Sequence, residues 1–436
     1  LIAAVSAGCH RWACRFMTDP ELSRLFLAIV TLLMAALTVG YLFDRLGLPR
    51  VVGEIMGGLA LGPSMLGGLF PDIHGWLFEA AGKQGTALDV LYWIGLVLLL
   101  FTSGFRIQRN LSRDDRNTIL VVLVAATALP FGLGFAAPVM FDLSFLIGSA
   151  GNTLAFQLVM GVAVAVTSIP VISKIFIDLG IIETRFAKIV LGCATLQDLV
   201  LWTVLAIATG LIADGLPAAT REVSLLQAGK TAAITLGFLA VSLWLAPLLL
   251  KALDGTRINI ISRSSPTGYT LAICFIFAAL AAALGINAIF GAFVAGIAVG
   301  ALPDETFSEV KRRIADVSLA FFVPIYFALV GLKIDLPRFL DPMFTANFIV
   351  LTTMVELGAV ILAARLIGKT PLTSFNLGMA MNTRGGPGIV LASVALSFGI
   401  INGVFFVTLV LAAVITSLAS GAWFRLLLRR GLPLYN

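Results

Sequence analysis

The chain has 436 residues, of which 59% are hydrophobic and 12% are charged, and its mean hydropathy is +1.04. Soluble domains carry about 25% charged residues, so this composition excludes a soluble fold and predicts one membrane domain over residues 1–436. The net charge of +6 comes from short basic clusters between apolar runs, where orientation signals are found. We therefore expect the lipid bilayer as a partner, and no nucleic acid.

Apolar segments long enough to cross a bilayer, about 20 residues each, follow one another along the whole chain. We expect an all-α polytopic membrane protein with thirteen transmembrane helices. In chain order they are 24–44, 48–67, 86–105, 118–140, 154–178, 186–212, 228–252, 267–284, 286–302, 314–334, 346–367, 374–399 and 403–426. An odd number of helices places the two ends of the chain on opposite sides of the membrane.

The basic residues indicate the orientation. Most of the 29 Lys and Arg residues fall in loops that follow the odd-numbered segments. Because basic loops stay in the cytoplasm, the sequence predicts an external N-terminus and a cytoplasmic C-terminus. The expected location is the cell membrane, or the inner membrane where a cell has two.

Two glycine-containing motifs occur twice, seven predicted helices apart. Residues 52–62 (VGEIMGGLALG) correspond to 290–300 (FGAFVAGIAVG), and 104–107 (GFRI) correspond to 331–334 (GLKI). An offset of seven helices reverses the orientation of the second copy, so the matches indicate an inverted repeat.

The repeat divides the predicted membrane domain into three parts. Helices 1–6 (about 24–212) and helices 8–13 (about 267–428) form the two halves, and a linker helix (about 228–252) joins them. We expect no cytoplasmic regulatory domain in this chain.

Proline interrupts two predicted helices at matching positions of the repeat. The fifth helix reads VAVTSIP over 164–170, and the twelfth reads MNTRGGPG over 381–388. Proline removes a backbone donor and clashes with the preceding turn, and unwound backbone at membrane depth occurs beside protein or a water-filled cavity. Both helices are therefore predicted to be broken beside a transport site, although a simple kink would also explain either proline alone.

Asp198 is the one acid in the apolar stretch of the sixth predicted helix. A charge near the bilayer centre costs several kcal/mol, so such a residue is functional unless it has a partner. One carboxylate can hold a proton or a cation but not both, and this competition gives exchange. Alkali cations prefer oxygen ligands, and we expect them from Gln197, Thr167, Ser168 and Thr195.

Arg384 is the one basic residue that the sequence places in the middle of the membrane, at the break in the twelfth helix. It can balance the acid of helix six, clamp the unwound chain through Asn382 and Thr383, or serve as a structural counter-charge. We favour a structural and electrostatic role, because a guanidinium hardly deprotonates. The roles of Glu54 and Glu356 stay open.

These residues resemble the membrane domain of the monovalent cation/proton antiporter-2 superfamily, which includes sodium/proton exchangers and potassium efflux proteins. The resemblance rests on 48–64 (LPRVVGEIMGGLALGPS), 99–105 (LLFTSGF), 167–170 (TSIP), 197–198 (QD) and 382–385 (NTRG). It implies two crossing broken helices and a homodimer in which one domain of each chain moves, elevator-like, and carries Asp198 across the membrane. A separate cytoplasmic regulatory domain or subunit is a further partner that the resemblance suggests.

The resemblance also bears on the transported ion. Many exchangers of that superfamily have Asp or Asn before the helix-six acid and the potassium efflux branch has Gln, so Gln197 favours K⁺, with Na⁺ next. Electrogenic relatives carry a lysine in helix ten, which 321–327 lacks, so one-for-one, electroneutral exchange is implied. We expect no cofactor, only K⁺ or Na⁺ and H⁺ as transported ions with the alkali cation at Asp198, and no enzymatic activity.

Two other functions remain open at this point. In one, the chain is a regulated, channel-like potassium efflux protein in which Asp198 only attracts cations. In the other, it is an ion-coupled carrier of an organic solute on the same architecture.

Overall fold

The structure is a computed structural model that describes residues 17–78, 83–105, 115–213, 225–254, 264–302 and 304–435. Across these ranges the chain is helical, and its only β-type pairing is an isolated bridge between Ile147 and Ile401. The described part of the chain is therefore all-helical, as expected. Helices satisfy their backbone hydrogen bonds internally, which a bilayer requires.

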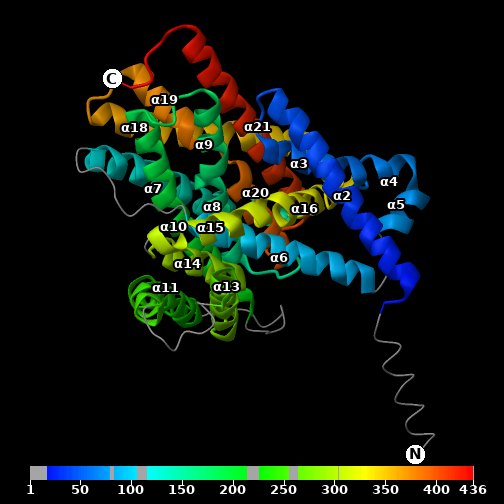
Figure 1. Ribbon diagram of the computed structural model, residues 1–436. Coiled ribbons are helices and arrows are strands. Elements are labelled where there is room, and N and C mark those ends of the chain that lie inside the picture. Colours follow the sequence, from blue (N-terminus) through cyan, green and yellow to red (C-terminus); the bar gives the residue numbers. More distant parts are fainter. Residues whose placement is uncertain are drawn as a thin grey trace, which may run out of the picture.

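The helices follow the apolar segments of the sequence (Figure 1). Those that cross or cap the bundle are α2 (Asp19–Arg45), α3 (Arg50–Leu61), α4 (Leu66–Leu69), α5 (Pro71–Phe78), α6 (Lys83–Phe105), α7 (Arg116–Met140), α8 (Thr153–Ala165), α9 (Ile169–Asp178), α10 (Arg185–Ala213), α11 (Leu225–Asp254), α13 (Pro266–Ala283), α14 (Ala288–Gly300), α15 (Asp304–Val317), α16 (Val323–Leu332), α17 (Leu336–Phe339), α18 (Pro342–Leu366), α19 (Pro371–Met381), α20 (Gly385–Ser397) and α21 (Gly403–Arg429). A π-helical turn, Ser318–Phe322, joins α15 to α16.

The expected count of thirteen membrane-spanning helices is not confirmed by helix length and composition. The described residues contain eleven helical segments long and apolar enough to cross a bilayer. Two of the predicted segments fall short because α14 has 13 residues and the twelfth segment divides into α19, with 11, and α20, with 13. A helix of 13 residues rises only about 20 Å, against a hydrocarbon core of about 30 Å.

The helices pack as two bundles, and α11 contacts both of them at the edge of the molecule (Figure 1). The first bundle contains α2, α3, α6, α13, α14 and α16, and the second contains α7 to α10 and α18 to α21. Each bundle combines helices from both halves of the chain. The linker helix α11 lies against α10 of the second bundle and α14 of the first.

Close glycine contacts hold the first bundle together. A Cβ atom on Gly58 of α3 would overlap the carbonyl of Ala328 on α16, beside Gly331. A Cβ atom on Gly296 of α14 would overlap a carbonyl of α6, beside Gly104. Both contacts therefore join residues of the two repeated motifs, each from a different half of the chain; positions 106–107 of the second motif lie outside the described residues.

Candidate functional site

Two broken helices of the second bundle cross beside each other. The chain leaves the helical conformation between α8 and α9 at residues 166–168, and again between α19 and α20 at residues 382–384. The N–H of Ser168 donates to the carbonyl of Thr383 at 2.5 Å, and the Thr167 hydroxyl donates to the Met381 carbonyl at 2.5 Å. The two unwound segments thus satisfy part of each other's hydrogen bonding, near the centre of the molecule in Figure 1.

Proline and serine begin the half-helix that follows the first break. Pro170 lies in the first turn of α9, where its missing N–H costs nothing. The Ser168 hydroxyl accepts a hydrogen bond from the Val171 N–H at 3.3 Å and caps the helix. The local sequence therefore ends one helix and starts the next within three residues, 166–168.

Side chains supply donors to the carbonyl groups that the end of α8 leaves free. The Gln197 amide nitrogen donates to the Ala165 carbonyl at 2.7 Å and to the Ala126 carbonyl at 3.0 Å. The Arg384 guanidinium donates to the Val164 carbonyl at 3.2 Å. Gln197 and Arg384 thereby tie α10, α7 and the second break to the end of α8.

Asp198 lies in the middle of α10, one residue beyond Gln197, and is 6% exposed. Its Oδ1 atom has no hydrogen-bond partner among the described residues. The carboxylate faces a cavity of about 100 Å³, which is larger than a single water molecule requires. An oxygen that lacks a partner beside such a space is available to a proton or to a cation.

The cavity lies between the two bundles. From the first bundle it is lined by Val51, Leu99, Leu100, Thr102, Ser103, Phe293, Leu319, Val323 and Phe327, and from the second by Ile169, Pro170, Asp198, Trp202, Gly386, Pro387 and Val390. The carboxylate and both half-helix starts thus form one wall, and the first bundle forms the other.

Arg384 has its electrostatic partner in Glu356 of α18. Both side chains are buried, at 2% and 1% exposure. Neither carboxylate oxygen of Glu356 has a hydrogen-bond partner among the described residues, so the attraction acts without direct contact. One helical turn before Glu356, the Thr353 hydroxyl accepts a hydrogen bond from the Asn382 amide at 3.3 Å. Helix α18 therefore binds the second break directly through Thr353 and attracts Arg384 through Glu356.

The predicted oxygen ligands lie around the crossing and do not line the cavity. The Thr195 hydroxyl donates to Leu191 within its own helix at 2.7 Å, while Thr167 and Ser168 hold the crossing. The Thr383 hydroxyl donates to Met379 at 3.4 Å. Gln197 retains a side-chain oxygen with no partner in the described part of the chain.

Two hydroxyl groups on α6 line the cavity and were not among the ligands expected from sequence. Thr102 donates to the carbonyls of Leu98 and Leu99, and Ser103 donates to Leu99 at 2.8 Å. Because their hydrogens are used within the helix, these side chains offer only lone pairs to the cavity. Adjacent hydroxyls in the otherwise apolar run 99–105 are the signal that could have identified them.

Glu54 lies apart from this site. Its carboxylate accepts from the Arg50 guanidinium at 3.1 Å on the same helix, and the residue is 4% exposed. The cavity lining does not include it. An ion pair one turn apart accounts for its burial.

Crossing broken helices and a buried carboxylate beside a cavity between two bundles are features of ion-coupled membrane carriers. The chain belongs to the sodium/hydrogen exchanger family, whose transmembrane region matches residues 30–430.

Named relatives match this chain along most of its length. The Na⁺/H⁺ antiporter NhaS4 of Synechocystis is 29% identical over 89% of this chain and 93% of its own. The Na⁺/H⁺-K⁺ antiporter GerN of Bacillus cereus is 27% identical over 90% of this chain and 93% of its own. The K⁺/H⁺ antiporter 1 of Saccharomyces cerevisiae is 28% identical over 90% of this chain, which spans only 45% of the yeast protein.

A solved structure has the same fold. The sodium proton antiporter MjNhaP1 from Methanocaldococcus jannaschii aligns with a TM-score of 0.60 at 17% identity, over 94% of this chain and 97% of that one. The arrangement of helices is therefore shared despite the low identity.

Proposed function

We propose that this protein exchanges a monovalent cation for a proton across a membrane, and that Asp198 holds each ion in turn. The observation that carries the proposal is a buried carboxylate, one oxygen of which has no hydrogen-bond partner among the described residues, on the wall of a cavity of about 100 Å³ between two bundles. The relatives' names, all of which describe cation/proton antiporters, support it.

Competition at one carboxylate couples the two ions. A bare carboxylate in poorly solvated surroundings is unfavourable, so the empty site resists crossing the membrane until a proton or a cation neutralises it. Each ion then leaves on the side where the other is in excess. No step requires a cofactor or an enzymatic reaction.

The second bundle is our candidate for the part that moves. It carries Asp198 and both broken helices, whereas the opposite wall of the cavity belongs to the first bundle. An elevator-type movement of the second bundle would carry the carboxylate from one side to the other. In this proposal α14 and the α19–α20 pair complete thirteen crossings, and the glycine contacts of the first bundle support the inverted repeat.

We propose that exchange is one-for-one and electroneutral, and the charges near the site support this. Arg384 and Glu356 interact electrostatically, and we propose that neither changes its charge during the cycle, so that Asp198 is the single group that alternates between a proton and a cation. Residues 321–327 contain no lysine that could change charge with it.

Potassium is our first candidate for the cation and sodium the second. The names of related proteins include K⁺/H⁺, Na⁺/H⁺ and mixed antiporters. Gln197, whose side-chain oxygen has no partner in the described part of the chain, precedes Asp198 in α10, so that a neutral side chain stands there instead of a second acid. A neutral ligand suits the larger, more weakly hydrated K⁺.

The size of the cavity argues against an organic solute. Pockets for small organic molecules measure about 300–1,000 Å³, and this cavity measures about 100 Å³. A channel-like pathway is the remaining alternative, and it predicts cation flux that moves no protons.

The surroundings of the protein form part of the same proposal. We place it in the cell membrane, or the inner membrane of a cell that has two, with the N-terminus outside and the C-terminus in the cytoplasm. A homodimer and a separate cytoplasmic regulatory domain or subunit are the partners that we propose.

The test uses purified protein in liposomes that contain a pH-sensitive dye. Addition of K⁺ or Na⁺ outside should release protons from the lumen. The rate of release should change little when the membrane voltage is clamped. Asp198→Asn should abolish the signal, whereas Asp72→Asn, which changes an exposed acid on α5, should not. Normal exchange in Asp198→Asn would exclude the proposed role, and cation uptake without proton release would favour the channel.

A further inference from the structure

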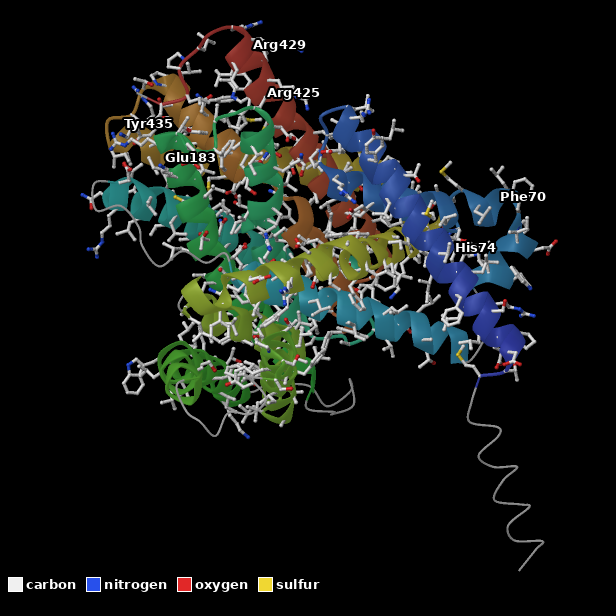
Figure 2. The ribbon with its side chains drawn as sticks, viewed as in Figure 1. Phe70, His74, Glu183, Arg425, Arg429 and Tyr435 are labelled. Carbon is white, nitrogen blue, oxygen red and sulfur yellow. The ribbon has the colours of Figure 1, made fainter. Side chains whose placement is uncertain are left out.

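A second hollow, of about 720 Å³, lies at the end of the molecule where α2, α9 and α21 finish. Figure 2 shows Arg425 and Arg429 there, on the last turns of α21. The hollow is lined by Asp44, Arg45, Gly47, Lys174, Asp178, Leu179, Arg425, Leu428 and Arg429. It therefore lies between the first bundle, which supplies α2, and the second, which supplies α9 and α21.

Two acids and one lysine that line this hollow form ion pairs with one another. Lys174 contacts Asp44 at 3.0 Å and Asp178 at 2.8 Å. Each carboxylate therefore has a cationic partner, and together the three groups carry one negative charge.

Three arginines of the hollow form no ion pair with a described residue. Arg45 donates to the Tyr41 hydroxyl at 2.7 Å, and Arg425 donates to the carbonyls of Leu46 and Gly47 across the boundary between the bundles. Arg429 forms no ion pair with any described residue. Three positive charges against one negative charge leave the hollow with a surplus of two.

Helix ends explain only part of this arrangement. Cations favour the last turn of a helix because they offset its dipole, which accounts for Arg45 and Arg429. Arg425 lies one turn earlier and reaches to the other bundle. The dipole of α21 does not explain why Arg425 extends to the first bundle. It also does not explain the surplus positive charge that lines the hollow.

We propose that this hollow binds a phosphate group, from either an anionic lipid or a soluble phosphate compound. The planar guanidinium matches phosphate with two parallel hydrogen bonds, and basic pockets at the ends of membrane helices bind anionic lipid head groups. The exposed side chains of Tyr41, Leu42 and Leu46 lie beside the arginines on α2 and its following turn. They offer an apolar surface for acyl chains.

A bound phosphate would join the two bundles. Arg45 belongs to the first bundle, and Arg425 and Arg429 belong to the second, so one ligand would hold them at a fixed separation. If exchange requires movement of the second bundle, the ligand would slow it. This consequence rests on the proposed function, whereas binding itself does not.

Binding is tested on the purified, delipidated full chain. Native mass spectrometry measures retention of phosphatidylglycerol against phosphatidylcholine, and calorimetry with pyrophosphate tests the soluble source. Arg425→Gln with Arg429→Gln should weaken the preferred ligand about tenfold or more, since each charge-assisted bond contributes about 1.5–3 kcal/mol. Arg365→Gln is the matched control, because Arg365 also ends a helix and donates to a backbone carbonyl, yet lies outside the hollow.

A variant that is expected to tighten binding distinguishes a change in the binding site from damage to the fold. Asp178→Asn removes a negative charge from the hollow and should tighten binding severalfold. Equal retention of the two lipids together with no heat from pyrophosphate would overturn the proposal, as would a double arginine variant that binds like the parent. Neither outcome would affect cation/proton exchange at Asp198, which the liposome assay measures separately.

Discussion

Asp198 faces hydroxyl groups that belong to the other bundle. Thr102 and Ser103 line the same cavity and offer lone pairs, since their hydrogens are bound within α6. If Asp198 binds a cation as proposed, these hydroxyl groups are candidate ligands from the opposite wall.

Removal of these two hydroxyls should weaken cation binding more than turnover. For Thr102→Val with Ser103→Ala, we expect KM for the cation to rise about fivefold for each lost contact of about 1 kcal/mol, with kcat nearly unchanged. The measurement is dye-reported exchange in liposomes over a range of cation concentrations.

Thr203→Val provides the matched control for that experiment. Thr203 also donates to its own helix, at 2.7 Å, but does not line the cavity. An unchanged KM in the double variant would remove both hydroxyls from the cation path.

Glu356 and Arg384 should depend on each other for stability. Removing one partner of a buried ion pair in contact costs about 3–5 kcal/mol, and we expect a smaller loss here because Glu356 and Arg384 form no direct bond. We expect Glu356→Gln to lower the melting temperature in detergent, and the double variant with Arg384→Gln to recover part of the loss. Additive losses in this double-mutant cycle would show that the two side chains act independently.

At the scale of the helices, the prolines of the sequence located both breaks but not the contacts between them. Pro170 and Pro387 come just after residues that leave the helical conformation. The hydrogen bond from Thr167 to Met381, however, joins residues 214 positions apart. Only the folded chain defines such a pair, because the crossing depends on how several other helices pack.

The sequence also could not determine which side chains are free to bind a cation. The sequence placed Asp198 at depth and Thr195 on its face of the helix, but helix geometry does not determine where a hydroxyl hydrogen goes. Thr195 donates it to its own backbone. The count of thirteen crossings is not confirmed either, since α14 and the two halves of the proline-interrupted segment, α19 and α20, are each shorter than a spanning helix.

Glycine contacts between helices give a prediction for the first bundle. Gly58→Ala should destabilise the protein by about 1–3 kcal/mol, because the added methyl group overlaps the α16 backbone and forces the helices apart. Gly237→Ala on α11 is the control, since a Cβ atom there meets nothing within 4 Å. Thermal unfolding in detergent measures both, and equal melting temperatures would contradict the tight packing of α3 on α16.

For the whole molecule, the boundary between the bundles is the feature that decides the mechanism. The cavity beside Asp198 opens along this boundary, and the ion pair between Lys174 and Asp44 crosses it. If the second bundle moves as a unit, contacts of this kind must break in every cycle.

A cleavable cross-link across the boundary should therefore stop exchange. With Asp44→Cys and Lys174→Cys in a background free of other cysteines, a disulfide-containing bis-maleimide should abolish proton movement. Cleavage of the linker with a reductant should restore it. Full exchange in fully cross-linked protein would exclude movement of the second bundle relative to α2.

The control joins two residues of one helix. Glu309 and Arg313 form an ion pair at 2.6 Å within α15, so cysteines at these positions can be linked without bridging the bundles. Exchange should continue after this reaction, which separates a block of movement from general damage by the reagent.

The crossing of the broken helices depends mainly on the main chain. Its acceptors are the carbonyl groups of Val164, Ala165, Met381 and Thr383. Every residue type offers a carbonyl, so the residues at these positions can change during evolution while the crossing persists. If Asp198 binds the transported ion as we propose, such a scaffold would let ion preference change through substitutions around it while the crossing is kept, which fits relatives, at 27–29% identity to this chain, that are named for sodium, potassium or both.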